Sequence, residues 1–388
     1  MPFDFDAVIP RAGTDCVKYD LRKTLFGRED VIPMWVADMD FAVPPFVAEA
    51  VRKRAGHPVY GYSVIPESYY DAVISWEKRR HGWELRKEWI LFSPGVVTGL
   101  NMIVQAFTEP GDKIIIQPPV YHPFFFCVEN NGRQLVLNRL KEENGHYSMD
   151  FDDLERKMKE GARMMILCSP HNPVSRCWRR EELEWLGAKC KENRVLLVSD
   201  EIHGDLVYSP NKHVPLASIS DDFAANTITC IAPSKTFNLA GLFTSSVIIP
   251  NENLRKQFIR TQEKLHISPN LFGITAAEAA YREGAEWLDQ LLGYLKSNAD
   301  QVKDFLAGQI PVISLSPVEA TYLLWLDFRK LGLPDAELKK LLVEKAGLGF
   351  FEGITFGPGG EGFQRMNIGC PSKILKEALQ RLASAIND

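Results

Sequence analysis

The sequence predicts an α/β protein with a large domain, built on an open and mostly parallel sheet flanked by helices, and a smaller α+β domain. Two observations predict the large domain. First, four short aliphatic runs lack polar alternation, as parallel strands covered on both faces do: KIIIQ (113–117), RMMILCS (163–169), VLLVSD (195–200) and NTITCIA (226–232). Second, helical patterns such as 180–193 lie between these runs, and this order indicates βαβ units.

The βαβ rhythm fades later in the chain, which predicts the second domain. Residues 270 to 307 have the pattern of a long helix that is interrupted near Gly284 and Gly293. The remaining pattern is TYLLWLDF (321–328), an amphipathic helix (335–345), a glycine-rich loop (356–363) and a final helix (372–386). We expect an N-terminal segment at 1–45 that packs with the small domain, a large domain at 46–285 and the small domain at 286–388.

Composition and charge argue against several classes of protein. The chain has 388 residues and 45% hydrophobic composition, enough for a large core. Its net charge of −5, with no basic stripe, argues against nucleic acid as a partner. No apolar run reaches the ~18 residues of a membrane span, and the first residues lack the pattern of a signal peptide. Seven scattered cysteines and isolated histidines predict neither a disulfide framework nor a metal site, and they favour a cytoplasmic location.

Three polar side chains come directly after expected strands. Asp200 ends the 195–200 run, and burying an ionised acid costs several kcal/mol (roughly) unless it meets a cation. Lys235 follows the 226–232 run, where it is either a surface lysine or an amine with a lowered pKa that forms Schiff bases. Asn172 follows the 163–169 run and is either part of an Asn-Pro turn or an amide aimed at a ligand. Ligands in such sheets bind at the carboxyl ends of the strands.

Two further segments complete a set of groups at this edge. SPGVVTGL (93–100) enters a helical pattern, and the first backbone N–H groups of a helix are suited to a phosphate. Tyr121, after the 113–117 run, either packs in the core or stacks on a flat ring. Amine, acid, amide, phosphate cradle and aromatic ring together match one cofactor, pyridoxal phosphate (PLP). Asp200 would then meet a protonated pyridine nitrogen.

The order of Asn-Pro, Asp-Glu-Ile and Ser-Lys resembles that of the fold-type I PLP enzymes, the aminotransferase superfamily. A narrower resemblance, to the MalY/PatB group of cystathionine β-lyases or C–S lyases, rests on PMWVADMDF (33–41), YGY (60–62), SDEIHGDL (199–206) and PSKTFNLAG (233–241). The resemblance extends over nearly the whole chain.

This resemblance implies a role for each matching position. Lys235 would bind the cofactor aldehyde and remove the substrate Cα proton, and Tyr121 would stack on the ring and is a second candidate for proton transfer. Asp200 would contact the ring nitrogen, and Asn172 and His203 would contact the ring oxygen. Val96, Val97 and Ser234 would lie near the phosphate. Tyr62 would reach the same phosphate from the other subunit of a homodimer. The substrate carboxylate would bind Arg365 as a bidentate fork, beside Val36, Ala37 and Asn172.

One position departs from the wider superfamily. Phe243 stands eight residues after Lys235, where many aminotransferases place an arginine against the phosphate, and the lyase group also lacks this arginine. The resemblance therefore implies a PLP-dependent β-elimination that converts cystathionine or a related cysteine S-conjugate into a thiol, pyruvate and ammonia. Two alternatives stay open: an aminotransferase with the same cofactor, and a lyase that is also a regulatory binding protein. The presence of Lys235, Asp200, Asn172 and Arg365 argues against a third, a relative with an inactive site.

Overall fold

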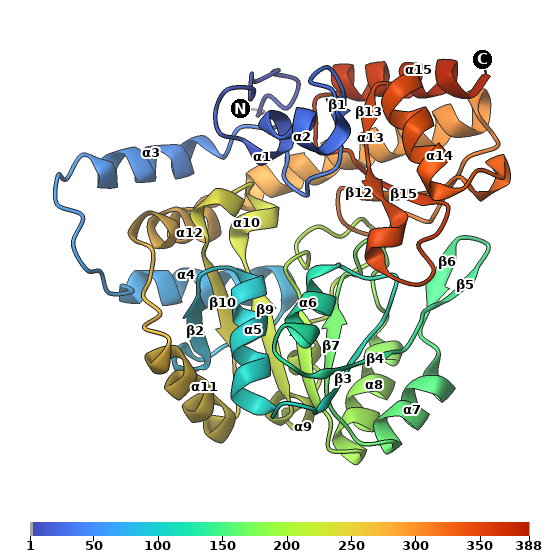
Figure 1. Cartoon of the computed structure of the whole chain (residues 1–388). Coiled ribbons are helices and arrows are strands. Elements are labelled where there is room, and N and C mark those ends of the chain that lie inside the picture. Colours follow the sequence, from blue (N-terminus) through green and yellow to red (C-terminus); the bar gives the residue numbers. More distant parts are fainter. Residues whose placement is uncertain (1–2, 388) are drawn as a thin grey trace.

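The computed structural model describes residues 3–387. Its main feature is a seven-stranded sheet with the order β2-β10-β9-β8-β7-β3-β4 (Figure 1). The strands are β2 (Ile90–Ser93), β3 (Lys113–Ile116), β4 (Gln134–Leu137), β7 (Ala162–Cys168), β8 (Leu196–Asp200), β9 (Thr227–Ile231) and β10 (Ser245–Ile248). Only β10 runs antiparallel to its neighbours. The predicted α/β class with a mostly parallel sheet is confirmed.

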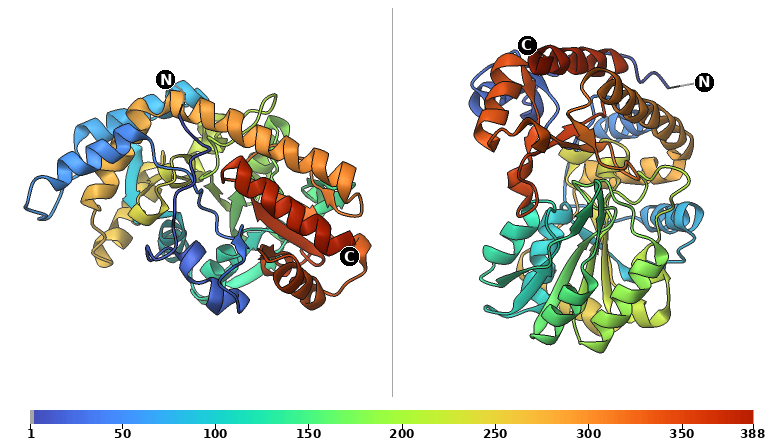
Figure 2. Two further views of the ribbon diagram at one scale, coloured as in Figure 1. Left: turned by 90° about the horizontal axis from the view of Figure 1, so that it is seen from above. Right: turned by 90° about the vertical axis from the view of Figure 1, so that its right-hand side faces the viewer.

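Helices cover both faces of this sheet (Figure 2). One face carries α5 (Val96–Phe107), α6 (Pro123–Glu129) and α11 (Glu252–Lys264), and the other carries α7 (Phe151–Lys159), α8 (Arg180–Glu192) and α9 (Asp221–Ala225). Alternate strand residues enter two different cores: Ile114 and Ile116 of β3 pack in one, and Ile115 packs in the other. Because both faces are buried, the strands are aliphatic throughout and show no polar alternation.

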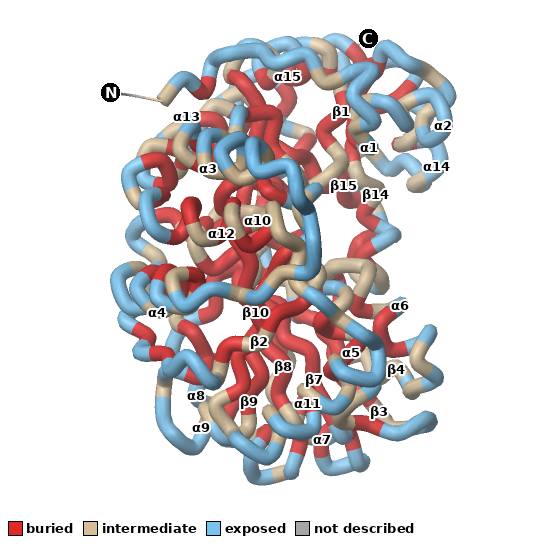
Figure 3. Tube along the Cα trace, turned by 90° about the vertical axis from the view of Figure 1, so that its left-hand side faces the viewer, coloured by how far each residue is buried: buried red, intermediate tan, exposed pale blue. Residues whose placement is uncertain are grey.

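A further group of helices lies outside the layers that cover the large sheet. Helices α3 (Pro45–Ala55), α4 (Glu67–His81) and α12 (Leu271–Glu283) pack together, and the segment that joins α3 to α4 is largely exposed (Figure 3). The predicted break at Gly284 separates α12 from α13 (Ala285–Gln309). A Cβ at Gly284 would lie 2.3 Å from the Ala280 carbonyl oxygen, so only glycine fits there. The predicted break at Gly293 is wrong, because α13 continues through it and its packed face outweighs the low helix propensity of one glycine.

The C-terminal part holds a four-stranded antiparallel sheet of β11 (Ser314–Leu315), β12 (Leu323–Asp327), β15 (Phe363–Asn367) and β14 (Phe351–Glu352). Helix α15 (Ser372–Asn387) packs against α13 beside this sheet, and α14 (Asp335–Lys340) continues as a π-helix to Lys345. The N-terminal segment forms α1 (Val17–Asp20), α2 (Arg22–Phe26) and β1 (Ile32–Pro33), and β1 pairs with β13 (Leu348–Gly349). The hairpin of β5 (Lys141–Glu143) and β6 (His146–Ser148) completes the strands.

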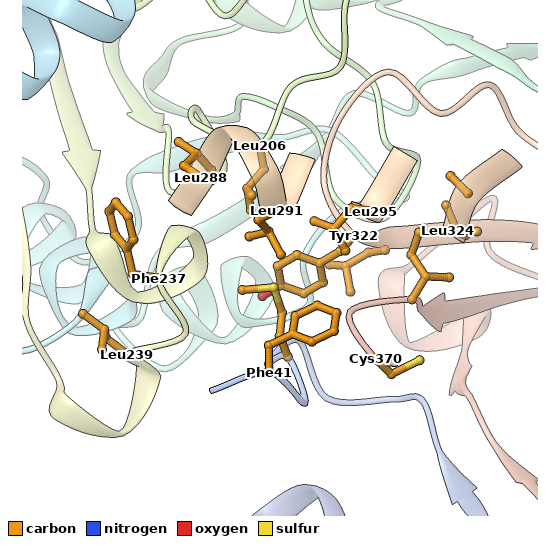
Figure 4. Close-up of a cluster of buried hydrophobic side chains, with 14 of the residues drawn as sticks. Phe41, Leu206, Phe237, Leu239, Leu288, Leu291, Leu295, Tyr322, Leu324 and Cys370 are labelled. Atoms are coloured by element: carbon orange, nitrogen blue, oxygen red, sulfur yellow. The ribbon is translucent and has the colours of Figure 1, made fainter. Parts of the chain in front are cut away.

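One apolar core joins the three parts of the chain (Figure 4). Phe41 comes from the N-terminal segment, Leu206 and Phe237 from loops beside the large sheet, and Leu291 and Tyr322 from the C-terminal part; all five are buried. This shared core fixes the small sheet over the carboxyl ends of the large one. The division into segments 1–45, 46–285 and 286–388 stays a prediction. Among residues 3–387, no helix is both long and apolar enough to cross a membrane.

Candidate active site

A cavity of about 200 Å³ lies at the carboxyl ends of the parallel strands. Tyr121 follows β3, Asn172 follows β7, Asp200 ends β8 and Lys235 follows β9, and all four line this cavity. The strand register explains their meeting, because Cys168 of β7 and Cys230 of β9 pair with Asp200 of β8 on either side. The sequence placed these residues at one sheet edge, and the structure brings them into one cavity.

Asp200 is buried, and no side chain among residues 3–387 forms an ion pair with it. One carboxylate oxygen, Oδ1, accepts a hydrogen bond from the backbone N–H of Ile202 at 3.2 Å. Burial raises the pKa of Asp200 to about 7, against the lowering effect of that bond and of the Lys235 cation. An acid in this state is strongly stabilised as an anion by any cation that enters the cavity.

Lys235 lies in the short helix α10 (Pro233–Thr236) and points into the cavity. Its Nζ donates a hydrogen bond to the carbonyl oxygen of Ala37 at 2.6 Å. Burial lowers the pKa of Lys235 to about 8, and the Arg365 cation adds to this, whereas Asp38 and Asp200 act in the opposite direction. The alternative of a surface lysine is therefore wrong, and a useful fraction of the amine is neutral and nucleophilic near neutral pH.

His203 and Tyr121 are neutral groups in the wall. Burial, together with the nearby Lys235 and Arg365 cations, lowers the pKa of His203 to about 3, and its buried Nδ1 has no hydrogen-bond partner among the described residues. Burial raises the pKa of Tyr121 to about 12, so its phenol keeps its proton. The orphaned imidazole nitrogen indicates a polar atom of a ligand beside it.

The other end of the cavity is formed by the start of α5. Gly95 precedes the helix with φ of +93°, a conformation that only glycine adopts readily, and the hydroxyl of Ser93 donates to the Gly95 carbonyl oxygen at 2.9 Å. The first N–H groups of a helix have no intrahelical acceptor, so Val96 and Val97 offer them to an anion. Ser234 lines this cavity as well.

Among the described residues, no arginine lines this cavity and Lys235 is the one lysine in its wall. Phe243, where the wider superfamily has an arginine, lines the wall with φ of +43° and leaves 63% of its surface exposed. Thr98 and Thr244, which the sequence analysis did not single out, also line this cavity, and the Thr244 hydroxyl donates to the Leu242 carbonyl oxygen at 3.1 Å.

Arg365 lies beside the cavity rather than in its wall. It extends from the central strand β15, is 2% exposed, and has its guanidinium 4.9 Å from the ring centres of both Phe351 and Phe356. Nη1 donates to Asn172 Oδ1 at 2.9 Å and Nη2 to the Trp35 carbonyl oxygen at 2.8 Å, whereas the buried Nε has no partner among residues 3–387. Burial lowers the pKa of Arg365 to about 10, so the group stays cationic at neutral pH.

A backbone segment from Trp35 to Asp38 closes this side of the site. The Ala37 carbonyl oxygen accepts from Lys235 Nζ and also from Tyr322 Oη at 2.9 Å. Asn367 Nδ2 donates to the carbonyl oxygens of Val36 and Asp38, both at 2.6 Å. The sequence analysis named Val36 and Ala37 but missed Tyr322 and Asn367.

Tyr62 does not reach the cavity of its own chain. It is fully exposed and lies in the segment between α3 and α4 that extends from the body of the molecule (Figures 1 and 3). Its expected contact with a phosphate therefore requires a second subunit and stays a prediction.

The donor set fits PLP. The cavity offers an amine with a lowered pKa, a buried acid without a cation, a neutral imidazole whose Nδ1 lacks a partner, and a helix start behind a positive-φ glycine. These are the groups that an aldehyde, a pyridine nitrogen, a ring oxygen and a phosphate require.

Comparison with known proteins gives consistent relatives over the full length. The model of the family "Aminotransferase class I and II" matches residues 29–382. Cystathionine beta-lyase PatB of Bacillus subtilis (strain 168) is 47% identical over 386 residues, which cover 99% of this chain and 100% of that protein. Protein MalY of Escherichia coli (strain K12) is 33% identical over 390 residues, 99% of each protein. The crystal structure of cystalysin from Treponema denticola, which contains a PLP cofactor, aligns over 100% of both chains with a TM-score of 0.97 and 38% identity.

Proposed function

Because the chain belongs to the class I and II aminotransferase family, we propose that it is a PLP-dependent C–S lyase of fold type I. Its reaction is the β-elimination of cystathionine or a related cysteine S-conjugate to a thiol, pyruvate and ammonia. The observation that carries the proposal is the placement of Lys235 and Asp200 in one cavity, with pKa values moved to about 8 and about 7. The 47% identity to a cystathionine beta-lyase over the whole chain supports the choice of reaction.

PLP, when bound, supplies an aldehyde for amines and a cationic ring that accepts the electron pair left on the substrate Cα. Lys235 would hold the aldehyde and Asp200 the ring nitrogen. Asn172 and His203 lie at the buried side of the cavity, where the ring oxygen would be. The N–H groups of Val96 and Val97, with Ser234, would hold the phosphate, and Tyr121 would stack on the ring.

The chain's own residues would divide the proton transfers among them. Lys235 Nζ, with a pKa that burial lowers to about 8, removes the Cα proton as a neutral amine. The phenol of Tyr121, with its pKa raised to about 12, keeps a proton that it can give to the departing sulfur. Arg365 orients the substrate carboxylate: its guanidinium lies beside the cavity, bonded through Nη1 to Asn172 in the cavity wall, and its Nε has no partner among residues 3–387.

We further propose a homodimer in which Tyr62 of one subunit completes the phosphate site of the other. The segment between α3 and α4 supports this, because Val59, Tyr60, Tyr62 and Val64 are each more than half exposed. Mixing the inactive Lys235→Ala protein with a Tyr62→Ala protein tests it, since a mixed dimer contains one intact site. Recovery of activity on subunit exchange supports the shared site, and no recovery between proven dimers contradicts it. The cytoplasmic location stays a prediction from the sequence.

One assay separates the lyase from the aminotransferase that shares its first proton transfer. The purified protein is loaded with PLP and incubated with cystathionine, and pyruvate and free thiol are measured. A parallel reaction contains a 2-oxo acid and measures the amino acid formed from it. The lyase proposal predicts pyruvate and thiol in equal amounts without any oxo acid. Amino transfer that depends on the oxo acid, with no thiol released, would favour the aminotransferase. The regulatory alternative rests on the resemblance alone and stays a hypothesis.

A further inference from the structure

A group of buried ionisable side chains lies behind the wall of the cavity, on the far side of the segment that carries Asp200 and His203. Its members are Glu77, His81, Glu201, Asp205 and His213, whose side chains are less than 10% exposed. They surround a space of about 10 Å³, which is room for roughly one water molecule. The reaction proposed above uses none of them.

The group contains two carboxylate–histidine pairs that face each other. Glu201 Oε2 lies 2.9 Å from His213 Nε2, and Asp205 Oδ1 lies 3.0 Å from His81 Nε2. The two imidazole rings meet edge to face, with 5.1 Å between their centres. A Cβ at Gly204 would lie 2.8 Å from His213 Cδ2, so the glycine of SDEIHGDL allows this close approach.

Asp205 links this group to the catalytic amine. Its carboxylate accepts hydrogen bonds from Thr236 Oγ1 at 2.8 Å and from Trp76 Nε1 at 3.0 Å, in addition to the contact with His81. Thr236 directly follows Lys235, and Asp205 is two residues beyond His203. The Asp205 side chain therefore connects helix α10, called here the Lys235 turn, to the Asp200–His203 segment, whose side chains would contact the cofactor ring.

The carboxylate of Asp205 is suited to this task because it is an anion with several donors. Burial acts to raise its pKa, but the bonds from His81 and Thr236 outweigh burial and hold the pKa of Asp205 below its ordinary value. Glu77, in the same group, differs: burial raises its pKa to about 8, so it is mostly neutral at neutral pH. Asp205 is therefore the charged centre to which the donors around it are aligned.

We propose that Asp205 is a positioning residue, which ties the Lys235 turn to the Asp200–His203 segment through Thr236 so that the amine and the acid face the cofactor together. The inference rests on PLP as the cofactor of the proposed function. It does not require that the reaction be an elimination.

The test deletes the donor of the Asp205–Thr236 bond on one side and neutralises its acceptor on the other. Thr236→Val keeps the shape of the side chain and deletes the donor, and Asp205→Asn removes the negative charge. Thr236→Ser keeps the donor and is the conservative rescue. Thr108→Val is the matched control, because it deletes a buried threonine hydroxyl at the C-terminal end of α5, which donates to the Val104 carbonyl oxygen and accepts from Arg133 Nε.

Three quantities are measured for each protein: the dissociation constant of PLP from the apoprotein, the pH midpoint of the bound-cofactor absorbance, and the melting temperature of the apoprotein. We expect Thr236→Val and Asp205→Asn to weaken PLP binding by about 10- to 100-fold, the size of loss that follows removal of an outer contact that orients a metal ligand. We expect both to move the pH midpoint in the same direction, because the Lys235 amine loses its fixed position. Thr236→Ser and Thr108→Val should keep the wild-type affinity and midpoint.

A Thr236→Val protein with wild-type PLP affinity and midpoint would overturn the proposal. So would an Asp205→Asn protein whose only change is a lower melting temperature, since that describes a purely structural residue. If Asp205→Asn does not fold, Thr236→Val decides alone. A wild-type protein that binds no PLP would overturn the proposed function together with this inference, whereas wild-type binding with an unaffected Thr236→Val protein overturns the inference only.

Discussion

The two ends of the active-site cavity are built from different parts of the chain. At one end lie two ionisable side chains, the half-buried Lys235 and the buried Asp200, whose pKa values desolvation moves to about 8 and about 7. At the other end lie the backbone N–H groups at the start of α5, behind Gly95, and no arginine of residues 3–387 lines the cavity there. The first end would perform the chemistry and the second would anchor the phosphate. Substitution of a side chain should therefore be severe at the first end and mild at the second.

The free energy lost by desolvation also differs between the two ends of the cavity. Ionisable groups lose hydration when they are buried, and the shifted pKa values of Lys235 and Asp200 record that loss. A helix start loses little, because its first N–H groups lack intrahelical acceptors in any protein. The catalytic end is accordingly surrounded by fixed contacts, such as the Ala37 carbonyl oxygen on Lys235 Nζ, whereas the anchoring end depends on one backbone conformation at Gly95.

The largest effect is expected for Lys235→Ala. This change removes both the group that holds the cofactor and the base that takes the Cα proton, and loss of a general base alone costs about 10²- to 10⁴-fold in rate. Pyruvate formation from cystathionine should fall below detection, and the absorbance of covalently attached cofactor should disappear. Lys264→Ala, at an exposed position, is the control and should behave as wild type. Full activity in the Lys235→Ala protein would show that the amine has been assigned to the wrong residue.

Asp200→Asn should have the next largest effect. Asparagine has nearly the same shape but cannot stabilise a cationic ring nitrogen, and loss of one such electrostatic contact typically costs about 10²- to 10³-fold in kcat. The cofactor should remain attached to Lys235, because that bond is at another position of the cavity. Steady-state kinetics and the absorbance spectrum together check this. A variant with wild-type kcat would refute the role of the acid.

The pH dependence of cofactor attachment tests the Lys235 end of the cavity without a mutation. Only the neutral amine attacks an aldehyde, and burial lowers the pKa of Lys235 to about 8 in the apoprotein. The amine is mostly protonated below that pH, so the rate should rise about tenfold between pH 7 and pH 9 and then level off. Rapid-mixing absorbance measurements of apoprotein with PLP give this rate. A rate that keeps rising steeply to pH 10.5, as for a free lysine, would contradict the lowered pKa.

The smallest effects are expected at the anchoring end. Gly95→Ala places a side chain at φ of +93° and ψ of 152°, a conformation that costs about 1–3 kcal/mol without glycine, so PLP affinity should fall by roughly 5- to 150-fold. Val97→Ala leaves the backbone N–H in place and should change the affinity by less than about twofold. Titration of apoprotein with PLP compares the two. A greater loss for Val97→Ala than for Gly95→Ala would reverse the contrast between backbone and side-chain recognition.

The sequence identified those site residues whose position follows from a local pattern and from the direction of the strand before them. Lys235, Asp200, Asn172 and Tyr121 each follow an aliphatic run, and parallel strands must bring their carboxyl ends to one edge. The strands β2 and β10 were not recognised, and the continuous α13 was predicted to break at Gly293, because packing decides such short or glycine-containing segments.

The contacts that the sequence did not reveal come from distant parts of the chain. Tyr322 reaches the Ala37 carbonyl oxygen across 285 residues, and Asn367 reaches Val36 across 331. Asn367 ends β15 and Tyr322 directly precedes β12, and only the docking of the small sheet over the large sheet makes them part of the site. No local pattern encodes that docking, so a buried tyrosine or asparagine in an apolar strand carries no specific signal.

The most direct test of the account is the location of the cofactor on the chain. The PLP-loaded protein is reduced with borohydride and digested, and mass spectrometry then identifies the lysine that carries the pyridoxyl group. The account predicts one modified residue, Lys235, at close to one cofactor per chain. A pyridoxyl group on another lysine, or none on the peptide that contains Lys235, would contradict it.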